Sequence, residues 1–190
     1  MYNKIEDLWE ISMNNDLIEA ADNFDRHFLI NNEKLLFSNI EFFEKLFLYL
    51  IENKKNKTVI LILKNFKKNI PDRILNIGLY HSLTKKNKVV FNYYYKYQIK
   101  TIKKDYNLIL LLATEHSLIE CVEKLLLLNE FNFKNDGDKP FLKAIYNEYT
   151  DIIRLFLFHR SKETNDYLKL NPYIKKNVYF ILLKHNIELF

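Results

Sequence analysis

The feature that most constrains this fold is a set of similar segments that recur about every 31 residues, a period within the range of repeat proteins. The segments are KKNKTV at 54–59, KKNKVV at 85–90, SLIECV at 117–122 and EYTDII at 148–153. Each stands between two apolar stretches, an order typical of helix, polar turn and helix. One helix pair cannot bury its apolar face alone, so a period of this length predicts stacked pairs that cover one another.

Four apolar positions mark the repeat at nearly constant intervals: Val59, Val90, Val122 and Ile153. Two fainter copies, DLIEAA at 16–21 and KKNV at 175–178, predict further turns in irregular end repeats. The nearly continuous apolar runs 59–64 and 178–183 predict helices that are covered on both sides.

The main rival to the helical interpretation is a strand at VILIL (59–63) and VVFNYYY (89–95). Branched and aromatic residues of this kind favour strands. The same register elsewhere holds CVEKLLLL at 121–128, where apolar residues recur at i, i+3 and i+4 as in a helix. Because the copies share one fold, the pattern predicts helices at all of them.

The segment 136–157 resembles the ankyrin repeat. That family's unit runs D-G-x-T-P-L-H-x-A, then G-H-x-E-[IV]-[VI], then a leucine-rich helix. Here DGDKPFLKA at 136–144 and EYTDII at 148–153 occupy these places. The resemblance covers two repeats over about residues 105–160, whereas the copies near 45–68 and 75–98 match in spacing and apolar pattern only. Lys139 and Leu142 replace the Thr and His that tie turn to helix in the family.

The resemblance implies an all-α fold, an ankyrin-like α-solenoid of stacked helix-turn-helix repeats with short or irregular hairpins. We expect a single repeat domain over 1–190, with a degenerate N-terminal cap at 1–44, four repeats at 45–160 and C-terminal capping helices at 161–190. A tight turn at Asp136-Gly137 and a helix whose first turn contains Pro140 are expected at the best-preserved joint.

By the same resemblance, the expected function is noncatalytic protein binding through hairpin tips and the exposed surface of the first helix of each pair. Any of the matching positions could equally be an ordinary solvated surface residue. The positions are Asp136, Asp138, Lys139, Tyr146, Asn147, Glu115 and His116.

An alternative partner is nucleic acid or an acidic surface, because the charge is unevenly distributed. Residues 51–105 carry 14 Lys or Arg and 3 Asp or Glu, whereas residues 1–50 carry 4 and 10. Stacked repeats would align the basic turns along one edge, and clustered cations attract phosphates. The opposing interpretation is a solvated face in a chain with 25 Lys and only 4 Arg. The basic patch comprises Lys54, Lys55, Lys57, Lys85, Lys86 and Lys88.

Catalytic and metal chemistry find little support in the sequence, so we expect no enzyme, no cofactor and no metal site. A calcium loop at NDGDKP (135–140) would need an oxygen ligand at position 134, where the chain has Lys134. Cys121 with His116 could form a nucleophile pair, but Cys121 occupies an apolar position of the repeat, which favours a buried packing residue. The five histidines lack metal-ligand spacing, and two glycines cannot make a phosphate loop.

The sequence also predicts a monomer in an intracellular, cytoplasmic setting, binding an unidentified protein without a membrane. No apolar run approaches the roughly 18 residues of a bilayer span. The N-terminus is acidic and lacks the pattern of a signal peptide, and a single cysteine fits a reducing compartment. The lysine- and asparagine-rich composition is similar to that of degenerate ankyrin proteins of large DNA viruses and A/T-rich protists, which for a virus would mean the host cytoplasm.

Overall fold

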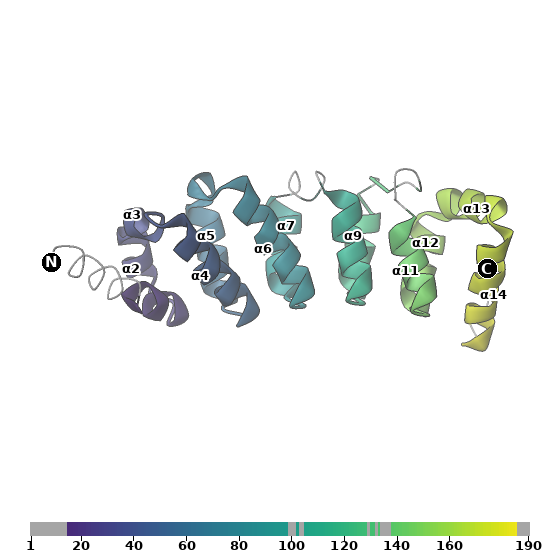
Figure 1. The fold of residues 1–190 in the computed structure, drawn as a ribbon, viewed down its shortest axis with the longest axis horizontal. Coiled ribbons are helices and arrows are strands. Elements are labelled where there is room, and N and C mark those ends of the chain that lie inside the picture. Colours follow the sequence, from purple (N-terminus) through teal and green to yellow (C-terminus); the bar gives the residue numbers. More distant parts are fainter. Residues whose placement is uncertain are drawn as a thin grey trace. The chain divides into compact units, whose positions relative to one another are not determined.

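A computed structural model describes residues 15–98, 102, 105–128, 130–131, 133 and 138–185 of the chain. Within these residues every regular element is a helix and none is a strand, as Figure 1 shows. The predicted all-helical fold is therefore confirmed, including both segments for which a strand was the rival. The fold divides into two compact units, residues 1–93 and 94–190.

The first unit contains helical residues 15–22 and a series of paired helices. The elements are α2 (Arg26–Asn31), α3 (Glu33–Leu36), α4 (Ile40–Glu52), α5 (Asn56–Asn65), the 3-10 turn η1 (Lys67–Asn69), α6 (Asp72–Thr84) and the start of α7 (Lys88–Tyr97). Helix α4 packs against both α5 and α6. The run 59–63 of α5 is buried except at Ile60, as its continuous apolar sequence predicts.

The second unit follows the same order of helices. Its elements are α9 (Tyr106–Glu115), α10 (Ile119–Leu126), α11 (Lys139–Tyr146), α12 (Thr150–His159), α13 (Ser161–Leu170) and α14 (Pro172–Lys184). First helices pack on first helices (α9 on α11) and second on second (α10 on α12), while α13 and α14 follow α12 (Figure 1). Pro140 lies in the first turn of α11, as predicted, whereas the expected turn at 136–137 lies outside the described residues.

The repeat appears in the backbone as a series of left-handed turn residues. Among the residues that the structure describes, five non-glycine residues have φ between 53° and 58°, namely Phe24, Lys54, Lys86, Ser117 and Glu148. Consecutive members of the series are separated by nearly constant intervals. Each stands between the two helices of a pair, so one turn conformation recurs through both units.

Hydrogen bonds show why the chain adopts this conformation at each turn. At the second-unit turns the amide of Leu118 donates to Ala113 O at 2.9 Å, and the amide of Tyr149 donates to Ala144 O at 2.9 Å. The amides of Ser117 and Glu148 donate three residues back, to Thr114 O and Ile145 O. This is the Schellman pattern, which satisfies carbonyls left without partners at a helix end and requires a left-handed residue.

Replacing Ser117 with glycine is expected to raise the free energy of unfolding by about 0.5–1 kcal/mol. A side chain at positive φ costs about 1–2 kcal/mol, and glycine avoids this cost while losing about 0.5–1 kcal/mol to the greater freedom of its unfolded state. Urea unfolding followed by circular dichroism measures the change. Ser117→Ala is the control, because it removes the hydroxyl and keeps Cβ. Equal stability of the Gly and Ala variants would contradict the left-handed conformation assigned to Ser117.

The turns correct the register inferred from the lysine runs. Val59 lies five residues after Lys54, and the residue five after Lys86 is Phe91 rather than Val90. Both Val90 and Phe91 are fully buried, so the apolar pattern alone did not distinguish them. The two KKNK runs are therefore offset by one residue relative to the turns. The left-handed residue is the first lysine of the run at 54–57 and the second lysine of the run at 85–88.

The prediction of turns at the two faint end copies of the repeat was wrong. Residues 16–21 lie inside a helix, and the first turn comes later, at Phe24. Residues 175–178 lie within α14. The expected coverage of 178–183 on both sides is also wrong, since Tyr179, Phe180 and Leu183 are 49%, 57% and 50% exposed. A short match of polar and apolar letters does not specify a turn without the flanking helix ends.

Candidate functional site

Four of the predicted binding residues gather where α9 and α11 end. Glu115 is the last residue of α9 and His116 caps it, while Tyr146 and Asn147 hold the same places in α11. Because α9 and α11 pack side by side, the two ends are neighbours. We call these four residues the turn-end site.

Contacts across the two helices order the turn-end site. Lys143 of α11 places its Nζ 3.1 Å from Glu115 Oε1. The Tyr149 hydroxyl lies 3.5 Å from the Glu115 carbonyl oxygen, to which it donates. Glu115, His116 and Asn147 are half-buried, whereas Tyr146 is 85% exposed. One aromatic ring thus projects from a surface whose polar groups make contacts between neighbouring helices.

Asp138 and Lys139 lie away from this site, at the other end of α11. The helix has eight residues, which places its ends about 12 Å apart at 1.5 Å per residue. The Asp138 carboxylate accepts a hydrogen bond from the Tyr167 hydroxyl at 3.2 Å. Burial, followed by the charge of Asp138, raises the pKa of Tyr167 to about 12. Asp138 thus connects α11 to α13, and Asp136 lies outside the described residues.

The basic patch is partly neutralised within the first unit. Lys55 Nζ lies 2.8 Å from Asp22 Oδ1, and Lys85 pairs with the Glu52 carboxylate. Lys54 and Lys86 occupy the left-handed turn positions, and they are exposed, as are Lys57 and Lys88. Binding of nucleic acid or an acidic surface by segment 51–105 stays a prediction, and carboxylates of the chain itself engage Lys55 and Lys85.

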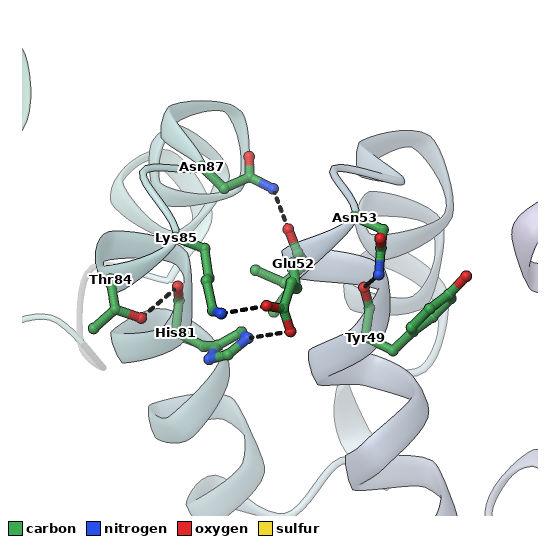
Figure 2. A network of polar contacts seen from close by, with 8 residues as sticks. Tyr49, Glu52, Asn53, His81, Thr84, Lys85 and Asn87 are labelled. Carbon is green, nitrogen blue, oxygen red and sulfur yellow. Dashed lines mark hydrogen bonds and ion pairs between the residues drawn. The ribbon is translucent and has the colours of Figure 1, made fainter.

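Figure 2 shows the contacts that join the turn ends of α4 and α6. The Glu52 carboxylate pairs with Lys85 Nζ, and its Oε2 lies 3.9 Å from His81 Nε2. The buried Asn87 donates to Ile51 O at 2.9 Å and to Asn56 Oδ1 at 2.8 Å. Lys85, first among several causes, holds the pKa of the Glu52 carboxyl below its ordinary value. Carboxylates of one turn thus bind basic groups of the next.

Sequence reasoning missed these inter-turn pairs, although a signal for them exists. Glu52 and Glu115 each stand two residues before a left-handed turn residue. Their partners, His81 and Lys143, each stand five residues before the left-handed residue of the following turn. An acidic residue two positions before one left-handed residue, with a basic residue five positions before the next, would have indicated these pairs. This pattern requires the turn register, which the sequence alone did not show.

Acidification below about pH 6.5, the ordinary pKa of histidine, is expected to lower the stability through His81. Burial and then the charge of Lys85 lower the pKa of His81, and they outweigh the opposing effect of Glu52. Between the folded and unfolded pKa values the unfolded chain binds more protons, so the free energy of unfolding rises with pH. The contribution is complete above about pH 6.5 and is lost as the pH falls through the folded-state pKa.

Urea unfolding at a series of pH values tests this expectation. The dependence on pH should be steeper in the wild type than in His81→Gln, which cannot titrate there. Identical slopes in wild type and His81→Gln, or a gain in wild-type stability on acidification, would contradict it.

Several other features bear on chemistry. Cys121 lies in α10 and is 2% exposed, which agrees with a packing residue. In the described part of the chain, no three His, Cys, Asp or Glu side chains come together as a metal site would need. None of the described helices combines the length and apolar character needed to cross a bilayer.

Comparisons with known proteins identify no relative from which the fold or the site could be inferred. No family model matches the chain, no curated protein matches it, and no solved structure matches it.

Proposed function

We propose that this chain is a noncatalytic protein-binding module of the ankyrin-repeat type, an α-solenoid that holds a protein partner at its turn-end site. The recurrence of one left-handed turn supports the proposal. Ser117 and Glu148 stand where the family's G-H-x-E motif has glycine, and both have φ of 53°. The packing of α9 on α11 and of α10 on α12 is what stacked repeats require.

The observation that carries the proposal is the exposed ring of Tyr146 on a surface with polar contacts between neighbouring helices. Tyrosine is enriched among the residues that dominate binding energy at protein interfaces, because it buries a large area at low entropic cost. The Glu115–Lys143 pair and the Tyr149 contact hold the surroundings of the ring before any partner arrives. Preorganised surroundings reduce the ordering cost of association.

A photo-crosslinking side chain at position 146 tests the proposal in cells. We expect a covalent adduct with a protein partner when the crosslinker replaces Tyr146. The control position is Phe158, an aromatic residue that is 78% exposed but lies at the far end of α12. Adducts of equal yield at the two positions would show unselective collision and would count against the site.

Tyr146→Ala is then expected to weaken binding of the captured partner at least about tenfold, which corresponds to about 1.4 kcal/mol. Phe158→Ala should leave the affinity unchanged. Isothermal titration with purified partner measures both. An unaltered affinity of the Tyr146→Ala chain would remove the turn-end site from the interface.

A further inference from the structure

The last described helix, α14, carries an apolar stripe on its exposed side. Within the described residues α14, near the C-terminus in Figure 1, packs against α11, α12 and α13. Its buried residues are Val178, Ile181 and Leu182. The stripe runs along another face at spacings of three and four residues, which align on one side of a helix. It consists of Tyr173, Lys176, Phe180 and Leu183, whose apolar members are 77%, 57% and 50% exposed.

Lysines lie beside the stripe. Residues 169–185 contain four lysines and no carboxylate. Lys184 pairs with Glu148 and Lys169 with Asp166, while Lys175 and Lys176 are exposed. Lys176 Nζ lies 5.7 Å from the centre of the Phe180 ring, so cation and aromatic ring share one surface. An exposed helix face with several large apolar side chains and neighbouring lysines is the kind of surface that a partner covers.

The opposite character occurs in the first helix pair of the same chain. Residues 15–31 contain four carboxylates, of which Asp22 pairs with Lys55, and a single Lys or Arg, Arg26. Among them Asp16 and Glu19 are exposed beside Ile18, which is 38% exposed. Phe24 and Ile30 are 38% and 37% exposed. We call Asp16, Ile18, Glu19, Phe24 and Ile30 the acidic end surface.

We propose that the α14 stripe binds the acidic end surface of a second copy of this chain, head to tail. The two surfaces match in charge, and each carries exposed apolar side chains to bury. Complementary charges select and orient a partner, and apolar burial supplies most of the free energy. The contact is heterologous, so a bound pair still presents one free surface of each kind and further copies can add.

Sedimentation velocity over a wide concentration series tests the proposal with the full chain. The weight-average mass should rise from the monomer value of 23.1 kDa and pass the dimer value as concentration increases. Added salt should shift the rise to higher concentration, because exposed charges are screened. A monomer at every concentration would overturn the proposal, in agreement with the monomer predicted from sequence.

Charge reversal identifies the surfaces. Lys176→Glu alone and Glu19→Lys alone should each raise the dissociation constant at least about tenfold. An equimolar mixture of the two variants should associate again, because the reversed surfaces complement one another. The control Lys162→Glu reverses an exposed lysine of α13 outside the stripe and should associate like the wild type. Circular dichroism confirms that each variant is folded.

Two results would indicate a different binding partner for the α14 stripe. Failure of the mixture to associate, with assembly stopping at the dimer, would indicate a contact between like surfaces. A chain that stays monomeric yet sediments with phosphatidylserine vesicles, and loses this on Lys176→Glu, would indicate an anionic membrane surface. Either result overturns the head-to-tail contact.

Discussion

Replacing Phe156 with alanine is expected to lower the free energy of unfolding by about 3–5 kcal/mol. Phe156 is fully buried on α12, and its ring centre lies 5.1 Å from that of Phe131 and 5.2 Å from that of Phe141. The neighbouring rings belong to different segments and cannot collapse into the cavity without losing their own contacts. The large cost thus combines lost burial with a residual cavity.

The chain offers a matched control on the same helix. Phe158 is 78% exposed, so Phe158→Ala should change the stability by no more than about 0.5 kcal/mol. Urea titration of the full chain, followed by circular dichroism, compares the two. Because two units need not unfold together, the loss should appear in the transition of residues 94–190. Similar losses for the two variants would contradict the described packing of α12.

Replacing Arg160 with methionine is expected to lower the free energy of unfolding by about 2–3 kcal/mol. Arg160 is only 7% exposed, and its Nη2 donates to the carbonyl oxygen of Leu126, the last residue of α10. A helix end leaves its last carbonyls without partners and carries partial negative charge, which a guanidinium satisfies. Methionine keeps much of the volume but removes the donor to Leu126 O, and the loss of this buried hydrogen bond outweighs the apolar contacts that remain.

The end of α10 shows how specific this arrangement is. The Tyr95 hydroxyl donates to Lys124 O at 3.1 Å, and the Tyr106 hydroxyl donates to Leu125 O at 2.9 Å. Burial raises the pKa of Tyr106, so it remains a donor well above neutral pH. Three successive carbonyls thus receive side-chain donors from three different segments, with Arg160 as the third.

Two further variants make the Arg160 test decisive. Arg160→Lys keeps the charge with a single donor head and should lose less stability than Arg160→Met. Arg154→Met removes an exposed arginine from α12, the helix that Arg160 caps, and it should cost no more than about 0.5 kcal/mol. If the Arg154 and Arg160 variants lose the same stability, the Leu126 contact contributes nothing.

The turn-end site was partly foreseeable. The ankyrin resemblance selected Glu115, His116, Tyr146 and Asn147, and the packing of α9 on α11 brings these four together. It also selected Asp138 and Lys139, which stand at the opposite end of α11. A linear motif lists positions along one repeat, but only the length and direction of the helix determine which of them share a surface.

Residue type likewise failed to distinguish a surface cation from a paired one. Lys54 and Lys55 are adjacent in a basic run, yet Lys55 pairs with Asp22 from the preceding turn, while Lys54 is exposed. Arg160 is buried at a helix end, and Arg154 of the same helix is exposed. The partner of a charged group comes from another helix, so its pairing depends on packing that no local pattern encodes.

The sequence by itself determined that this chain is helical and repeats at a nearly constant interval. Apolar periodicity is a local property, and copies of one unit reinforce each other's signal. The tertiary structure alone decided the turn register, because Val90 and Phe91 are equally apolar and only the hydrogen bonds around Lys86 show which follows Val59. It alone decided which face of α14 is buried, because that depends on how α11, α12 and α13 pack against a helix with apolar residues on several sides.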